Sequence, residues 1–120
     1  MLRGRLLQTS QGMDILNNIA RQIASCTACP LSQNRTNPVP GEGPDQSDVI
    51  FIGEAPGFNE DQQGRPFVGP AGRVLETLLN SIGLKRSDIF ITNVVKCRPH
   101  NNRDPRPEEI ASCRKYLNAQ

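Results

Sequence analysis

Apolar residues recur at helical spacing in two segments of the chain, and residues typical of a helix start mark a third. Residues 14–25 carry apolar side chains at the i, i+3, i+4 and i+7 positions of an amphipathic helix. Residues 74–82 carry a second stripe, which ends before Gly83, a residue suited to capping a helix. A third helix is predicted from Pro107, because proline suits a first helical turn and two glutamates follow it.

Two short apolar runs, residues 49–52 and 89–95, lie on either side of the second helix. An unbroken apolar run of this length predicts a strand that is buried on both faces, as in a parallel sheet. The order strand, helix, strand is a βαβ unit with a right-handed crossover. The sequence therefore predicts an α/β fold with a parallel sheet and helices on both faces.

The segments between these elements are long and rich in Gly and Pro. Residues 1–12 show no periodicity, so we predict a loose tail there and one domain over residues 13–120. Loops are predicted over 30–48, 57–72 and 98–106. Two strands are fewer than the four to six of a usual α/β sheet, so we expect the domain to be truncated after the second strand and the helix that follows it.

Composition narrows the class of protein only slightly. The chain has 36% hydrophobic and 22% charged residues, as soluble globular proteins do, and a net charge of +2. This mild basicity is compatible with a nucleic-acid partner without indicating one. No apolar run approaches the roughly 20 residues of a membrane helix. We expect a cytoplasmic monomer, in which cysteines are seldom structural disulfides.

The four cysteines suit a tetrahedral thiolate site. Cys26 and Cys29 form a C-x-x-C pair at the end of the first helix, and Cys97 and Cys113 follow much later. Zinc and [4Fe–4S] clusters both accept four cysteines. The second pair is not a C-x-x-C knuckle of the kind common in structural zinc sites, which favours the cluster. Four ordinary buried thiols are the remaining interpretation.

Polar residues follow both predicted strands. In parallel sheets, ligands bind beyond the carboxyl ends of the strands, where Glu54 and Asn93 lie. The glycines at 53 and 57 permit a tight turn whose N–H groups can face a ligand, and Asn93 offers a donor and an acceptor together. Phe67 could stack on a base. Simpler roles are a solvated carboxylate for Glu54, a turn residue for Asn93 and a core residue for Phe67.

A basic run follows the second strand. Beside a nucleic-acid pocket its members would contact phosphates, although a solvated loop is the commoner outcome. His100, the single histidine, is expected to be polar surface. The run consists of Lys96, Arg98, Arg103 and Arg106.

Taken together, these stretches resemble the family 4 (iron–sulfur) uracil-DNA glycosylases, specifically the N-terminal part of their domain. The resemblance covers about residues 16–117. Its motifs are C-T-A-C-P-L (26–31), G-E-A-P-G (53–57), E-D-Q-Q-G-R-P-F-V-G (60–69), I-T-N-V-V-K-C-R-P (91–99) and N-N-R-D-P-R-P-E-E-I (101–110), followed by Cys113. No single motif is decisive, but their order and spacing are specific.

The resemblance implies a three-layer uracil-DNA glycosylase-like fold and a set of roles. The turn Gly53–Ala55 would hydrogen-bond a uracil carbonyl, Phe67 would stack on the flipped base, and Asn93 would read its Watson–Crick edge. Glu60 would crowd the C5 position against the thymine methyl group. A [4Fe–4S] cluster with a structural, DNA-positioning role would be held by Cys26, Cys29, Cys97 and Cys113.

The implied reaction is hydrolysis of the N-glycosidic bond of uracil in DNA, which starts base excision repair. Ala55 stands where related glycosylases carry a water-orienting carboxylate, as is usual in family 4. Glu54 is then the nearest candidate for helping the water or the cationic sugar. The family's C-terminal histidine motif is missing, so we expect a fragment with weak or no activity. The alternatives are a non-catalytic nucleic-acid-binding module and a zinc-ribbon-like interaction module.

Overall fold

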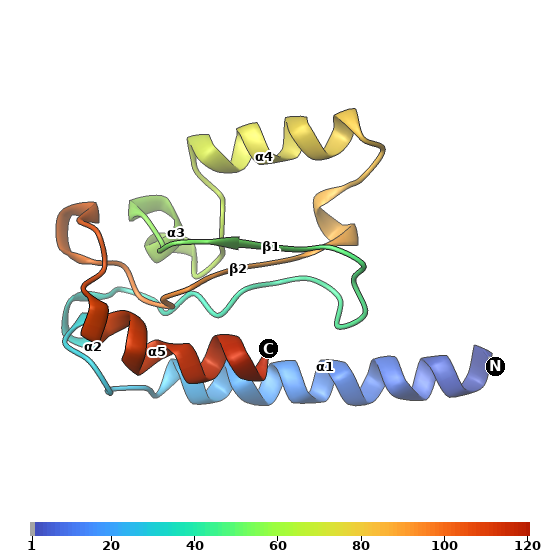
Figure 1. Cartoon of the computed structure of the whole chain (residues 1–120), viewed down its shortest axis with the longest axis horizontal. Helices are drawn as coiled ribbons and strands as arrows, with labels where there is room; N and C mark the ends of the chain where they lie inside the picture. The colour runs from blue at the N-terminus through green and yellow to red at the C-terminus, as the bar shows by residue number, and fades with distance from the viewer. Residues whose placement is uncertain (1) are drawn as a thin grey trace.

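A two-stranded sheet lies between helices in this computed structural model, which describes residues 2–120, with side chains from residue 12 onward. Helix α4 covers one face, and α1 and α5 lie on the other (Figure 1). This three-layer α/β arrangement confirms the predicted fold class. The elements are α1 (Leu2–Ala24), α2 (Leu31–Asn34), β1 (Ile50–Gly53), α3 (Phe58–Gln63), α4 (Pro70–Ser81), η1 (Arg86–Asp88), β2 (Phe90–Asn93), η2 (His100–Asn102) and α5 (Pro107–Ala119).

The two strands pair in parallel, which confirms the βαβ unit. Ile50 lies opposite Phe90, and Gly53 lies opposite Asn93. The backbone pairing continues past the strands, because the N–H of Val94 donates to the carbonyl of Gly53. Both strands run toward the end of the molecule where α2, α3 and η2 lie (Figure 1).

Apolar side chains form one core on each side of the sheet. Under α4, Leu75 and Leu79 pack with Ile89 and Ile91. On the opposite side, α1 packs against α5 and the end of β2; this second core consists of Ile19, Ile23, Val95, Cys113 and Tyr116. Part of each helical stripe packs in these cores, but Val74, Leu78 and Ile82 of the second stripe are 60–71% exposed.

Strand β1 differs from the prediction, which had it buried on both faces. Its apolar side chains are largely exposed, with Ile50 at 55% and Ile52 at 49%. Every residue of β2, in contrast, is buried. The reason is that β2 has β1 on one side and a bridge from Glu42 to Ile91 on the other, whereas in the described residues β1 pairs only with β2. The apolar run correctly predicted a strand but not its burial.

Helix α1 is longer than its apolar stripe indicated. Residues 2–12, which we predicted as a loose tail, continue the helix; Met1 lies outside the described residues. This segment lacks proline, and its leucines, arginines and glutamines are good helix formers even without periodicity. Among residues 2–120, no helix combines the length and apolar character that a membrane span requires.

The loops that we predicted contain short helices and are held by a buried carboxylate. Asp61 of α3, only 2% exposed, accepts hydrogen bonds from the backbone N–H groups of Thr36 (2.8 Å) and Asn37 (3.3 Å). The side chain of Asn37 in turn donates to the carbonyl of Asp61 at 2.9 Å. These bonds fasten the loop after α2 to α3.

We expect Asp61→Ala to lower the free energy of unfolding by about 1–3 kcal/mol, because it leaves two part-buried backbone N–H groups without their acceptor. Urea unfolding followed by circular dichroism measures this. The neighbouring Gln62→Ala is the control, since Gln62 is exposed. Equal stabilities of the two variants would contradict the role given to Asp61.

Candidate functional site

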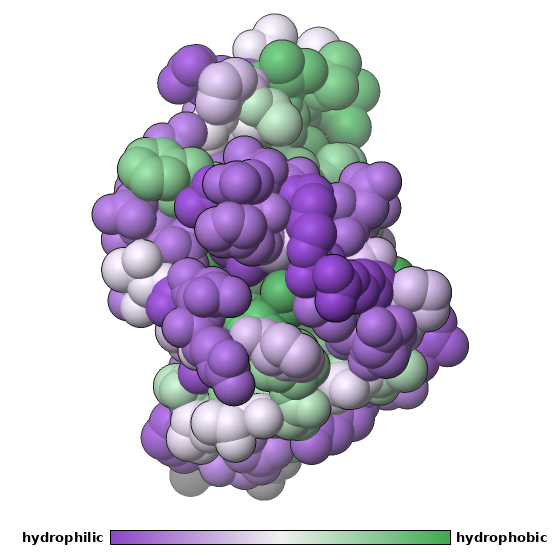
Figure 2. Space-filling model, turned by 90° about the vertical axis from the view of Figure 1, so that its left-hand side faces the viewer, coloured by the Kyte–Doolittle hydropathy of each residue, from purple (hydrophilic) through white to green (hydrophobic). Residues whose placement is uncertain are grey.

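A cleft of about 310 Å³ lies beyond the carboxyl ends of β1 and β2. This volume is within the range of small-molecule sites. Figure 2 views the molecule from this end, where the surface is largely hydrophilic around a hollow with hydrophobic atoms at its floor. The cleft is lined by Glu54, Ala55, Pro56, Gly57, Phe67, Asn93, Pro99, Asn102 and Arg103.

The strand pairing brings three of the predicted residues into contact at the cleft. Gly53 lies opposite Asn93, so a Cβ at position 53 would meet the Asn93 Oδ1 at 2.5 Å and the Phe67 ring at 2.5 Å. The amide and the ring therefore lie against the bare backbone of Gly53. Asn93 is 2% exposed, and no protein group in the described residues forms a hydrogen bond with its side chain. Its donor and acceptor are thus free for a ligand.

The ring of Phe67 is held from several sides. It packs edge-on against Phe51, with centroids 5.1 Å apart and planes at 85°. Its backbone adopts a left-handed φ of 52°, and the guanidinium of Arg86 binds the carbonyls of Pro66 and Phe67. Phe67 is half-buried, packs on the core under α4 and also lines the cleft. Phe67 is therefore both a core residue and a cleft residue, so each of the two predicted interpretations is partly correct.

Glu60, which we predicted to crowd a base, is not among the residues that line the cleft. Its carboxylate instead accepts backbone hydrogen bonds from Gly57 at 3.0 Å and from Val68 and Gly69 at 2.9 Å each. These bonds close the loop between positions 57 and 69, which carries Phe67. Glu60 therefore contributes to the shape of the cleft from behind it.

Arg103 brings a positive charge to the cleft and is fixed by a buried carboxylate. Its guanidinium donates to both oxygens of Glu109, at 2.8 and 2.9 Å, and the N–H of Arg106 donates to the same carboxylate at 2.8 Å. Glu109 is 1% exposed. The hydrogen bonds from Arg103 are the main reason that the pKa of Glu109 falls to about 2.

The four cysteines line a second, smaller cavity. Cys26 and Cys29 lie just after α1, Cys97 follows β2, and Cys113 lies in α5. All four are free thiols. Within the part of the chain that the structure describes, no three His, Cys, Asp or Glu side chains are placed to hold a single metal ion. The four thiols therefore share one cavity.

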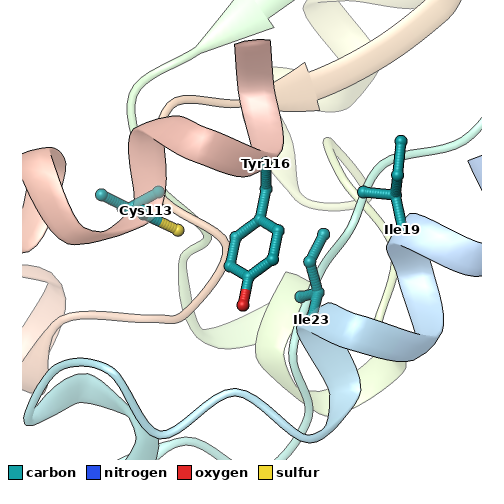
Figure 3. Close-up of a cluster of buried hydrophobic side chains, with 5 residues drawn as sticks. Ile19, Ile23, Cys113 and Tyr116 are labelled. Atoms are coloured by element: carbon teal, nitrogen blue, oxygen red, sulfur yellow. The ribbon is translucent and has the colours of Figure 1, made fainter. Parts of the chain in front are cut away.

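Apolar and basic groups surround these thiols. Tyr116 points from α5 toward Ile23 of α1, with Cys113 beside it (Figure 3). Burial raises the pKa of Cys97 and raises that of Cys113 to about 11, although Arg35 donates to the Cys97 sulfur at 3.0 Å. Burial also disfavours the Cys26 thiolate, but a hydrogen bond from Tyr116 and nearby positive charges outweigh it and lower its pKa.

Lys96 corrects our interpretation of the basic run, which placed it in a solvated or phosphate-binding loop. It is 1% exposed, and its ammonium donates to the Thr92 hydroxyl (2.6 Å), the Asn93 carbonyl (2.7 Å) and the Gln120 side chain (2.7 Å). Its backbone N–H donates to the Cys113 sulfur at 3.3 Å. Burial lowers the pKa of Lys96 to about 8. Lys96 therefore supports the end of β2 from inside.

Sequence reasoning missed Glu109 and gave Arg103 only a general role. A signal for Glu109 was present, because a glutamate three residues after a helix boundary commonly accepts from the boundary N–H, here that of Arg106. Its bond to Arg103 depends on how the loop before α5 folds back. No spacing rule encodes that path.

The amino-acid sequence of the chain is similar to those of known proteins. The model of the Uracil DNA glycosylase superfamily matches residues 40–120. The chain is 54% identical over 105 residues to a type-4 uracil-DNA glycosylase of Archaeoglobus fulgidus, covering 88% of this chain and 53% of the relative. It is 51% identical over 107 residues to the type-4 enzyme of Thermotoga maritima, covering 89% and 56%. The chain thus spans about half the length of these curated relatives.

We expect Glu109→Gln to lower the free energy of unfolding at pH 7 by about 1–3 kcal/mol, because a charge-assisted bond to Arg103 is weakened. The folded pKa of Glu109, about 2, lies below the ordinary value, so this stabilisation is present at neutral pH and is lost as the pH falls toward 2. Urea unfolding at pH 7, 5 and 3 should show the gap between wild type and variant closing.

Glu108→Gln is the matched control for this comparison. It removes the same charge from the same helical turn, but Glu108 is exposed. A stability difference that is as large for Glu108→Gln, or that does not change with pH, would contradict the proposed bond between Glu109 and Arg103.

Proposed function

Because the chain belongs to the Uracil DNA glycosylase superfamily, we propose that it removes uracil from DNA. In this proposal a uracil nucleotide leaves the base stack and its N-glycosidic bond is hydrolysed, which leaves an abasic site and starts base excision repair. The names of the relatives, type-4 uracil-DNA glycosylase, support this substrate and this reaction.

The observation that carries the proposal is the contact of Asn93 and Phe67 across Gly53 at one cleft. Phe67 would stack on the flipped base. Asn93 would donate to uracil O4 and accept from N3–H, and cytosine presents the opposite order at the same two atoms. The side-chain amide of Asn93 supports this role, because it lines the cleft and forms no hydrogen bond with another described residue.

The turn after β1 would stabilise the leaving group. Backbone N–H groups of Gly53, Glu54 and Ala55 would approach a base carbonyl and stabilise the negative charge that develops on the departing uracil. Glu54 is exposed at the cleft. Its carboxylate would orient the attacking water or stabilise the positive charge that develops on the sugar. We assign Glu60 a supporting role at this site, consistent with its bonds to the loop that carries Phe67.

We propose that Cys26, Cys29, Cys97 and Cys113 hold a [4Fe–4S] cluster. Zinc requires four sulfurs about 2.3 Å from one ion, whereas a cluster is ligated at four separated corners. Four free thiols around one cavity, without three ligands placed for a single ion in the described residues, favour the cluster. When bound, the cluster would supply a covalent crosslink between the end of α1, the end of β2 and α5.

We also propose that the protein acts on DNA as a cytoplasmic monomer. Four free cysteines suit a reducing compartment. Size-exclusion chromatography with light scattering of the metal-containing protein checks the oligomeric state.

The function is tested with an oligonucleotide that carries one uracil. We expect the wild-type chain to bind it in preference to the thymine-containing oligonucleotide, and uracil release to be measured by strand cleavage at the abasic site in hot alkali. Asn93→Asp should weaken uracil binding at least tenfold, because one donor becomes a charged acceptor. Asn80→Asp is the control, because it replaces the same amide by the same carboxylate at an exposed position of α4.

Two results would contradict the function. A wild-type chain with neither uracil preference nor uracil release would remove the glycosylase assignment. A variant Asn93→Asp that keeps the preference would remove Asn93 from uracil recognition.

The cofactor is tested by anaerobic purification. We expect a brown protein with about four irons and four sulfides per chain, and Cys113→Ser should lose most of its iron.

Because Cys113 must lose its proton to bind metal and its pKa without metal is about 11, reconstitution of the apoprotein should improve as pH rises from 6 to 9. Ser112→Ala is the adjacent control. A colourless protein with one zinc per chain would contradict the cluster.

A further inference from the structure

An exposed aromatic ring and an arginine lie together at the rim of the cleft. Phe58 is 54% exposed and begins α3, directly after the cleft residue Gly57. The guanidinium carbon of Arg98 lies 5.3 Å from the centre of the Phe58 ring. The two residues come from separate segments, so the fold, rather than local sequence, pairs them.

The arginine of this pair is held in place but keeps its charge available. Its Nε donates to the Asn102 Oδ1 at 2.7 Å, and Asn102 itself lines the cleft with a left-handed φ of 57°. In the described part of the chain no carboxylate lies within ion-pair distance of Arg98, whereas Arg103 is held by Glu109. The guanidinium of Arg98 is therefore available to form an ion pair with a phosphate.

This chemistry fits a nucleotide. Bases of any sequence stack on aromatic rings, and arginine contacts to phosphates orient a protein on nucleic acid. The exposed ring of Phe58 can stack on a base, and the guanidinium of Arg98 over it can bind a phosphate of the same nucleotide. We propose that Phe58 stacks on a base next to the nucleotide in the cleft and that Arg98 pairs with the adjoining phosphate. This interface rests on the proposed function only in that the partner is DNA.

The test uses the metal-containing protein and a single-stranded oligodeoxynucleotide without uracil, with binding followed by fluorescence anisotropy. Phe58→Leu should weaken binding about 5- to 150-fold, the range for loss of one base stack, and Phe58→Tyr should restore it. Arg98→Gln should reduce the slope of log K against log salt by about 0.7, the value for one phosphate contact on a single strand.

Controls at the opposite end of the sheet separate these effects from general changes. Lys85→Gln removes the same charge just before η1, and Ile82→Ala removes an apolar side chain that is 71% exposed. Both should leave affinity and slope unchanged. Thermal melts of the Phe58 variants and of the two controls should match wild type, because these side chains are exposed.

The interface and the proposed function can fail separately. If the wild type prefers uracil but Phe58→Leu and Arg98→Gln bind as the wild type does, the interface is wrong and the function stands. If these variants lose binding while the wild type shows no uracil preference, the interface stands and the function is wrong. A wild-type chain that does not bind the oligonucleotide overturns the interface.

Discussion

The parallel pairing of β1 with β2, in the register that sets Gly53 opposite Asn93, is the constraint on which the site depends. It places the Asn93 amide and the Phe67 ring against a backbone that has no side chain. A shift by one residue would send Asn93 to the other face of the sheet, since side chains alternate along a strand. The N–H groups of Val94 and Val95 donate to the carbonyls of Gly53 and Glu54, which extends this register into the turn after β1.

The same strand end connects the cleft with the thiols. Lys96 holds the Asn93 carbonyl with its ammonium and the Cys113 sulfur with its backbone N–H. Helix α5 makes a second connection, because Glu109 fixes the cleft residue Arg103 one turn before Cys113. A group bound by the cysteines would therefore stabilise the segments that carry cleft residues. The proposed cluster would therefore support the cleft through these segments of the fold.

The sequence predicted the features that depend on neighbouring residues and missed those that depend on how distant segments pack together. Apolar stripes, apolar runs and helix-start residues located α4, α5, the second half of α1 and both strands, but not α2 or α3. The polar residues after the strands located Asn93 and Glu54 at the cleft, because parallel strands end at one edge. It did not predict that Lys96 is buried, since a lysine beside arginines resembles a solvated run. It also did not predict the exposure of β1, which depends on how many neighbours a strand has rather than on its own residues.

Three carboxylates, two of them buried and one half-buried, hold the loops of this chain. Glu60 closes the loop that bears Phe67, Asp61 fastens the loop after α2, and Glu109 fixes the loop before α5. Each is a carboxylate that accepts at least two N–H groups from a neighbouring segment. A buried carboxylate is stable only when its oxygens are satisfied, so each of these segments has one favoured position. The long loops of this chain can therefore present a defined cleft, although only a small apolar core supports them.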